Sequence, residues 1–171
     1  MHRPATVDDP ELLNGVMDVL ETLAREWPVI FPIHPRTRAR IAQKHTRAAD
    51  TKRVHIIDPV GYLEFLGLEK NARLVITDSG GVQEETTYLR VPCLTVRDNT
   101  ERPVTITTGS NTLVGRDPRR LLVAARQQLA SPTVSGAIPE LWDGHAAKRI
   151  ADVLQGILGP VPAKAPLHRV S

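Results

Sequence analysis

The chain has 171 residues, 41% of them hydrophobic, and its 22 basic and 19 acidic residues give a net charge of +3. This size suits one globular domain with its own core, and the mild charge and 4% aromatic content argue against a nucleic-acid partner. The single cysteine excludes a disulfide framework. No apolar run is long enough to cross a membrane, and residues 1–4 do not resemble a signal peptide. A soluble cytoplasmic protein is therefore expected.

Helical and extended patterns alternate along the chain. Asp9 followed by Pro10 is typical of a helix start, and the next apolar residues recur at helical spacing as far as Ala24. Short apolar runs such as 74–76 indicate strands that are covered on both faces. The sequence predicts helices at 10–24, 37–43, 62–68, 81–89, 118–129 and 146–158, and strands at 29–31, 54–57, 74–77, 93–96 and 111–114. The last helix is expected to turn its apolar face inward, with Ile150, Val153, Leu154 and Ile157 on that face.

This alternation predicts an α/β fold with a Rossmann-like, doubly wound parallel sheet. In such sheets, ligands bind beyond the carboxyl ends of the strands, near the point where the strand order reverses. Polar residues follow four of the predicted strands, namely His34, Asp58, the run 78–81 and the run 97–102. Their convergence at one edge of the sheet favours a ligand site there.

The run from 77 to 85 joins a predicted strand to a predicted helix through Ser79, Gly80 and Gly81. Ser79 is expected to cap the helix, and the glycines let a ligand approach the backbone closely. The N–H groups and the dipole at a helix start favour an anion such as phosphate, and the carboxylates at 84 and 85 can accept hydrogen bonds from hydroxyls beside it. This pattern indicates a nucleotide or a nucleotide sugar, although an ordinary capped turn would also show it.

Several motifs together make the chain resemble a known enzyme family. They are His2-Arg3, Val7-Asp8-Asp9-Pro10, Phe31 to Thr37, Asp58-Pro59 with Tyr62-Leu63 and Phe65, Asp78 to Glu85, Arg97 to Pro103, and Asn111 with Leu113-Val114-Gly115. From residue 2 to about residue 158, the chain resembles the carboxyl-terminal half of the non-hydrolysing UDP-N-acetylglucosamine 2-epimerases. That family has two facing Rossmann-like domains, as in the GT-B glycosyltransferases. The resemblance implies a UDP-binding carboxyl-terminal domain at 1–158. The tail at 159–171 contains three prolines and is expected to be disordered.

The resemblance also implies how UDP would be held. Phe65 would pack on the uracil, and the backbone around Val60 would bind the edge of the base. The helix start would bind the diphosphate, the ribose hydroxyls would donate to Glu85, and Arg102 would pair with phosphate. The UDP-binding residues implied in this way are Val60, Phe65, Ser79, Gly80, Gly81, Glu85 and Arg102.

Two histidines match family positions as well. His2 is the one catalytic residue that the resemblance places in this chain, beside the diphosphate and the sugar, where its protonated form would stabilise departing UDP. His34 matches a histidine near a second, regulatory UDP-sugar site in bacterial members. In the family reaction, a base removes the proton at carbon 2, UDP leaves carbon 1, and UDP adds back after protonation on the opposite face. The sequence holds no metal-binding motif, and no cofactor is expected.

Two features of the family are not matched by this sequence. The catalytic carboxylates lie in the amino-terminal domain, so the expected isomerase activity needs that domain, and the complete enzyme is expected to be a homodimer that serves polysaccharide synthesis. The apolar strand that leads into His2 is also unmatched, and it is the central strand in a 3-2-1-4-5-6 order. Its two neighbours would lose their partner, so the isolated chain is expected to be unstable or to self-associate.

Three other functions remain open on the sequence alone. A hydrolysing UDP-N-acetylglucosamine 2-epimerase would release UDP and free N-acetylmannosamine, although Gly80-Gly81 and the run 97–103 look more like the non-hydrolysing group. An inactive UDP-binding module or fragment would carry the same binding residues. A GT-B glycosyltransferase shares the architecture and the carboxylate on the ribose, but such enzymes rarely combine the runs 78–85 and 100–103.

Overall fold

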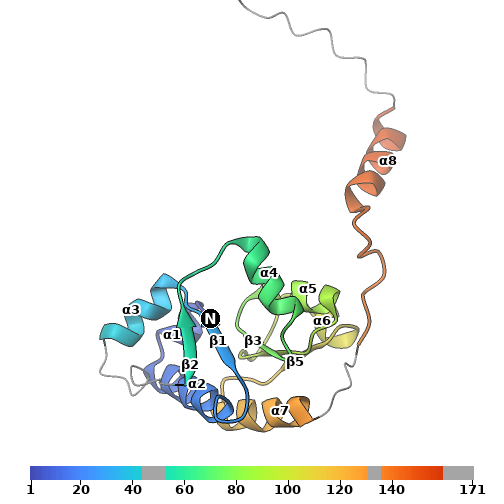
Figure 1. Cartoon of the computed structure of the whole chain (residues 1–171). Helices are drawn as coiled ribbons and strands as arrows, with labels where there is room; N and C mark the ends of the chain where they lie inside the picture. Colours follow the sequence, from blue (N-terminus) through green and yellow to red (C-terminus); the bar gives the residue numbers. More distant parts are fainter. Residues whose placement is uncertain (44–52, 131–135, 160–171) are drawn as a thin grey trace, which may run out of the picture. The chain divides into compact units, whose positions relative to one another are not determined.

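The computed structural model describes residues 1–43, 53–130 and 136–159, and it divides the chain into two units, Met1–Ile138 and Pro139–Ser171. Every helix and strand expected from the sequence is present, with bounds that differ by at most two residues, and only the short helices α1 and α6 were not expected. Residues 160–171 of the expected tail lie outside the described residues. The elements in chain order (Figure 1) are α1 (Pro4–Val7), α2 (Pro10–Leu23), β1 (Val29–Pro32), α3 (Pro35–Gln43), β2 (Val54–Ile57), α4 (Tyr62–Lys70), β3 (Val75–Thr77), α5 (Gly80–Leu89), β4 (Cys93–Thr95), α6 (Val104–Thr107), β5 (Asn111–Leu113), α7 (Pro118–Ala130) and α8 (Ala146–Leu158).

The described strands form two parallel sheets rather than one. One sheet pairs β1 with β2, with Val29 opposite Val54, and the other has the order β3-β4-β5. In a 3-2-1-4-5-6 order, β1 and β3 would flank the first strand. The sheet is therefore divided at the place where the sequence predicts a missing central strand, and β1 and β3 each have one edge without a strand partner among the described residues.

The first three residues lie between the carboxyl ends of β1 and β3. Thr37, in the helix after β1, donates a hydrogen bond from Oγ1 to the carbonyl oxygen of Met1 at 2.6 Å. The backbone N–H groups of His2 and Arg3 donate to the carboxylate of Asp78, directly after β3, at 3.0–3.1 Å. Asp78 is fully buried, so these hydrogen bonds connect the two halves of the divided sheet.

The hydrophobic core of the first unit lies where α2 and α7 pack against the sheets. Asp9 accepts hydrogen bonds from Glu11 N and Leu12 N, each at 3.1 Å, and so caps α2 as the sequence predicts. The two helices lie side by side (Figure 1), and a Cβ added at Gly15 would overlap the Cγ of Pro118, so this contact requires glycine. Buried apolar members of this core include Leu13, Val16, Met17, Leu94, Val96, Val114, Leu121 and Ala125.

Helix α8 differs from its expected packing. Its apolar side chains Ile150, Val153, Leu154 and Ile157 are exposed, from 49% at Leu154 to 74% at Ile157, so the prediction that they face inward is wrong for this structure. Helical periodicity identifies which face of a helix is apolar but not what covers that face.

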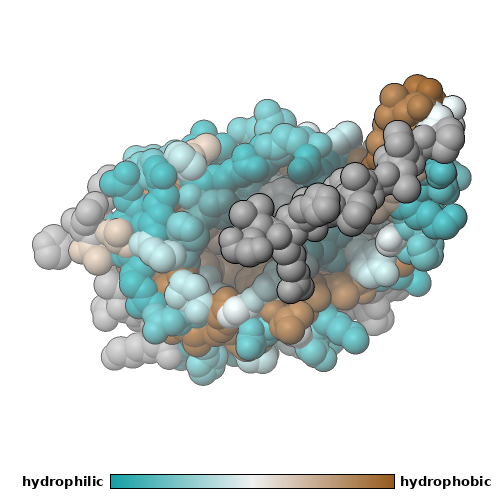
Figure 2. All heavy atoms as spheres, turned by 90° about the horizontal axis from the view of Figure 1, so that it is seen from above, coloured by the Kyte–Doolittle hydropathy of each residue, from teal (hydrophilic) through white to brown (hydrophobic). Residues whose placement is uncertain are grey.

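Hydrophilic side chains dominate the face shown in Figure 2. None of the described helices combines the length and the hydropathy that a membrane span needs.

Candidate nucleotide site

The start of α5 is an open anion-binding position. β3 ends at Thr77, and Ser79 occupies the N-cap position with an extended backbone, but its side chain makes no capping hydrogen bond. The expectation that the Ser79 hydroxyl caps α5 is therefore wrong. The first N–H groups of a helix have no partner within the helix. Without a side-chain cap, those of α5 are available to an anion, which the helix dipole also favours.

Gly80 adjoins two charged side chains at this helix start. A Cβ added at Gly80 would stand 3.8 Å from Arg3 Nη2 and 4.0 Å from Glu101 Oε2, both ordinary contact distances with the ends of flexible side chains. At Gly81 the nearest atom would be Ser79 Oγ, also at 4.0 Å. Packing within the protein therefore does not require glycine at either position. Close approach of a ligand to the backbone explains these glycines better.

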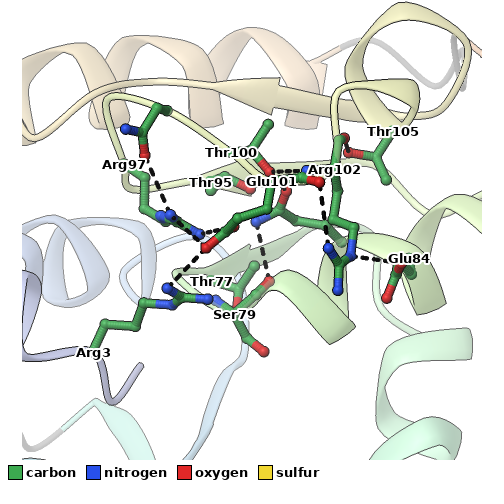
Figure 3. Close-up of polar contacts among 12 residues, drawn as sticks. Arg3, Thr77, Ser79, Glu84, Thr95, Arg97, Thr100, Glu101, Arg102 and Thr105 are labelled. Atoms are coloured by element: carbon green, nitrogen blue, oxygen red, sulfur yellow. Dashed lines mark hydrogen bonds and ion pairs between the residues drawn. The ribbon is translucent and has the colours of Figure 1, made fainter.

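Three arginines surround this helix start in two ion-pair groups (Figure 3). Glu101 accepts from Arg3 Nη1 at 3.1 Å and from Arg97 Nη1 at 2.7 Å, while Arg102 Nε lies 2.7 Å from Glu84 Oε1. Hydrogen bonds from Arg97, followed by a backbone hydrogen bond, lower the pKa of Glu101 to about 2. Of the three arginines, only Arg102 is assigned to phosphate binding in the sequence analysis. The signal for Arg97 was its place in the run 97–102, whereas the proximity of Arg3 depends on the fold.

A buried network of polar side chains supports the loop that carries these arginines. Gln83, fully buried in α5, accepts from Thr100 Oγ1 at 2.6 Å and from Asn111 Nδ2 at 3.2 Å. Its Nε2 donates to the carbonyl of Ser79 at 3.2 Å. Asn111 also accepts from Thr95 Oγ1 at 2.7 Å. Because each of these buried groups has a partner, the network fixes the loop relative to the start of α5.

His2 lies at the same edge, between the ends of β1 and β3. Its Nδ1 is 3.6 Å from Asp78 Oδ1, and its ring centroid is 5.3 Å from that of His34. Burial lowers the pKa of His2 from its usual value, while the charge of Asp78 acts in the opposite direction. His2 is therefore mainly neutral near pH 7 in this structure, and an anion bound beside it would raise its pKa. The exposed His34 accepts a hydrogen bond from Arg36 N at 3.1 Å.

The other side of the candidate site is formed where α4 packs against α5. Val60 precedes α4 and is exposed, and Phe65 within α4 is half-buried. Glu85 of α5 is also half-buried, and its negative charge is the main cause that raises the pKa of the Tyr62 phenol. Glu69 lies beside Glu85 as well, and burial followed by the charge of Glu85 raises its pKa to about 8. Glu69 was missed on the sequence, although its spacing of four residues from Phe65 gave a signal.

The described residues contain no group of three or more His, Cys, Asp or Glu side chains placed to hold a metal ion. Cys93 is buried, which raises the pKa of its thiol to about 11 and keeps it protonated. The helix N–H groups, arginines and carboxylates at this edge are suited to recognition of an anion with neighbouring hydroxyls.

A Rossmann-like sheet with an open helix start and clustered arginines defines an α/β domain suited to anionic ligands. A family model described as UDP-N-acetylglucosamine 2-epimerase matches residues 1–155, and the chain belongs to this family. The predicted family resemblance and the predicted fold, a Rossmann-like carboxyl-terminal domain of the GT-B type, are thereby confirmed.

This chain matches a similar share of the length of each relative and solved structure described next. The UDP-N-acetylglucosamine 2-epimerase of Methanococcus maripaludis is 41% identical over 160 residues, which are 91% of this chain and 43% of that protein. The UDP-2,3-diacetamido-2,3-dideoxy-D-glucuronate 2-epimerase of Pseudomonas aeruginosa is 39% identical over 155 residues, 90% of this chain and 42% of that protein. A crystal structure of Methanocaldococcus jannaschii UDP-GlcNAc 2-epimerase in complex with UDP-GlcNAc and UDP matches with a TM-score of 0.76 and 41% identity, over 91% of this chain and 43% of that one. The chain thus spans less than half the length of these relatives.

Proposed function

We propose that the chain is the nucleotide-binding half of a UDP-N-acetylglucosamine 2-epimerase and binds the UDP part of the substrate at the start of α5. The observation that carries this proposal is the uncapped helix start, with Arg3, Arg97 and Arg102 around it, in a chain of this family. A diphosphate needs donors and positive charge in that arrangement. The similar M. jannaschii structure is a complex with UDP-GlcNAc and UDP, which supports the same ligand class.

In this proposal each part of UDP meets one element of the site. The uracil packs on Phe65 and is read by the backbone at Val60, and the ribose hydroxyls donate to Glu85. On binding, Arg102 leaves Glu84 and pairs with phosphate instead. Because both partners are negatively charged, the guanidinium stays paired and the exchange costs little free energy. The diphosphate contacts are assigned to Ser79, Gly80, Gly81 and Arg102.

The role of this half in the reaction is to stabilise the leaving group. When the proton at carbon 2 is removed and the bond from carbon 1 to oxygen breaks, the electron pair of that bond goes to the UDP oxygen. The helix start and the arginines stabilise this new charge. His2 becomes more basic beside the diphosphate, because a neighbouring anion favours its protonated form, and it can then donate to the departing oxygen.

Removal of the proton at carbon 2 is assigned to a part outside this chain. The family's catalytic carboxylates belong to the amino-terminal domain, so epimerisation requires that domain as a partner. We further propose that the complete enzyme is cytoplasmic and a homodimer, and that His34, beside His2, contributes to a regulatory UDP-sugar site.

The P. aeruginosa relative, at 39% identity, is named for a different UDP-sugar, a 2,3-diacetamido-glucuronate. This second candidate substrate should therefore be assayed directly. Both substrates carry UDP, so the residues described above serve either one. The sugar is the part that differs, and product analysis with both compounds separates the two activities. The same analysis detects free N-acetylmannosamine, which a hydrolysing enzyme alone would release.

Calorimetric titration of the full chain with UDP tests the binding proposal. We expect saturable 1:1 binding that weakens about tenfold or more in Arg102→Ala, since charge-assisted hydrogen bonds to phosphate contribute about 1.5–3 kcal/mol. The matched control is Arg119→Ala, because the Arg119 side chain is 96% exposed on α7 and pairs with the neighbouring Asp117. A folded chain that does not bind UDP, or equal losses in both variants, would overturn the proposal.

A further inference from the structure

Glu69 is a buried carboxyl group without a donor. Its side chain is 3% exposed, and neither carboxyl oxygen has a hydrogen-bond partner among the described residues. An ionised carboxylate in such a place is costly, because it loses its hydration and gains nothing in return. The protonated form avoids this cost and can donate a hydrogen bond of its own.

Glu85 is the acceptor that the geometry offers for this proton. Glu69 on α4 lies beside Glu85 on α5, where the two helices pack together. Two neighbouring carboxylates repel when both are ionised, whereas one shared proton converts the repulsion into a hydrogen bond. The other titratable groups that interact with the pair are Tyr62 on α4 and Cys93 on β4.

Both of these neighbours are neutral near pH 7. The charge of Glu85 raises the pKa of Tyr62, and burial raises that of Cys93, so neither carries a charge that would stabilise an ionised Glu69. Burial and the charge of Glu85 raise the pKa of Glu69 itself to about 8. At pH 7 the pair therefore holds one proton and one negative charge.

We propose that Glu69 is a positioning residue that donates a hydrogen bond to Glu85 and so orients the Glu85 carboxylate toward the ribose hydroxyls of the nucleotide. This inference rests on the proposed function, in which Glu85 accepts from the ribose. One oxygen of Glu85 receives the proton of Glu69, and the other can accept from the neighbouring Tyr62 phenol or from the ligand. The hydrogen bond holds the Glu85 side chain in one rotamer before the ligand arrives, which lowers the conformational entropy lost on binding.

Loss of the shared proton has two consequences for nucleotide binding. Ionised Glu69 repels Glu85 and removes the contact that orients it. It also adds a negative charge beside the site of an anionic ligand. Affinity for UDP therefore falls as the pH rises through the titration of Glu69.

The test compares three substitutions in the full chain. Glu69→Gln keeps a hydrogen-bond donor but cannot ionise, Glu69→Leu has no donor and cannot ionise either, and Glu26→Gln is the control. Glu26 lies between α2 and β1, before the amino end of that strand and thus away from the site edge. The dissociation constant of UDP is measured by calorimetry from pH 7 to pH 9, and the carboxyl groups are titrated by carbon-13 NMR without UDP.

For the parent chain and Glu26→Gln we expect UDP affinity to fall about tenfold between pH 7 and pH 9, as one protonation with a pKa near 8 requires. Glu69→Gln should show no such fall beyond the titration of UDP itself, and Glu69→Leu should bind more weakly at every pH. In NMR, one carboxyl signal that is absent from Glu69→Gln should titrate near pH 8.

The two proposals fail in different ways. If UDP binds with the same pH dependence in the parent chain and in Glu69→Gln, the inference about Glu69 is overturned while the proposed function stands. A Glu69 carboxyl that titrates at its ordinary pH overturns the inference as well. If UDP does not bind at any pH although the carboxyl titrates near pH 8, the proposed function is overturned and Glu69 has no part in nucleotide binding.

Discussion

The two sheets of the first unit, the site sheet β3-β4-β5 and the edge sheet β1-β2, differ in how completely they are covered. All three residues of β4 are buried, whereas Ile30 in β1 is 50% exposed. The site sheet is linked to its loops by the buried network around Gln83. The edge sheet pairs only two strands among the described residues. The proposed ligand site therefore lies on the better supported sheet, while the stability of the unit depends on what joins the two.

Among the described residues of the first unit, several contacts join the two sheets, including the ion pair of Arg116 with Asp9 and the packing of Arg73 on the Trp27 ring. The backbone of residues 1–3 connects α3 with Asp78, helix α2 packs against α7, and α4 packs against α5. None of these contacts supplies strand pairing between β1 and β3, so the join depends on side chains and helices. This join can be probed at the open strand edges, at Asp78 and at the contact between α4 and α5, and the largest effect is expected from the strand edges.

The largest effect is expected from the unpaired edges of β1 and β3. Each edge presents backbone groups that no described strand satisfies, and such edges pair with other chains. We expect the isolated chain to self-associate or to unfold readily, with light scattering after size-exclusion chromatography showing oligomers or aggregate. A monodisperse monomer that unfolds in one cooperative transition would contradict this expectation.

A smaller effect is expected from removal of the Asp78 carboxylate. Asp78→Ala leaves the N–H groups of His2 and Arg3 without their acceptor in a buried position, so the free energy of unfolding should fall by about 2–4 kcal/mol. Urea unfolding followed by circular dichroism at low protein concentration measures this change. Asp58→Ala is the control, because the Asp58 side chain is 88% exposed and its ion pair with Arg38 should contribute little. Equal effects in the two variants would show that Asp78 does not join the sheets.

Sequence patterns predicted most of the fold because its elements are locally encoded. Asp9 caps α2, short apolar runs form the strands, and Gly80 begins α5, all through interactions within a few residues. The pairing of Arg3 with Glu101 spans 98 positions, so no local pattern reveals it. Periodicity likewise could not show that the apolar face of α8 is exposed.

In the candidate site as well, local features were predictable from the sequence, whereas features that depend on the fold were not. The position of Ser79 at the N-cap was predictable from the strand-to-helix pattern, but the free state of its hydroxyl was not, because that depends on the three-dimensional course of the backbone. The Thr77 hydroxyl accepts from Ser79 N at 3.0 Å, a contact between neighbours that the sequence also left undetermined. The state of Glu69 depends on a contact between two helices and therefore on the fold.

A further effect is expected from pH, acting at the contact between α4 and α5. The pKa of Glu69 is about 8 in the folded chain and is raised from an ordinary value of 4.5, so between these values the folded state holds a proton that the unfolded state has released. Stability from this group is therefore fully present below about pH 4.5 and is lost as the pH rises through 8. Urea unfolding at pH 5.5, 7 and 8.5 should show the free energy of unfolding of the parent chain falling relative to that of Glu69→Gln. Other groups with shifted pKa values, including His2 and Cys93, are common to both proteins and cancel in the difference. A difference that stays constant with pH would mean that Glu69 is ionised in the folded chain, and the join between the two sheets would then gain nothing from a shared proton.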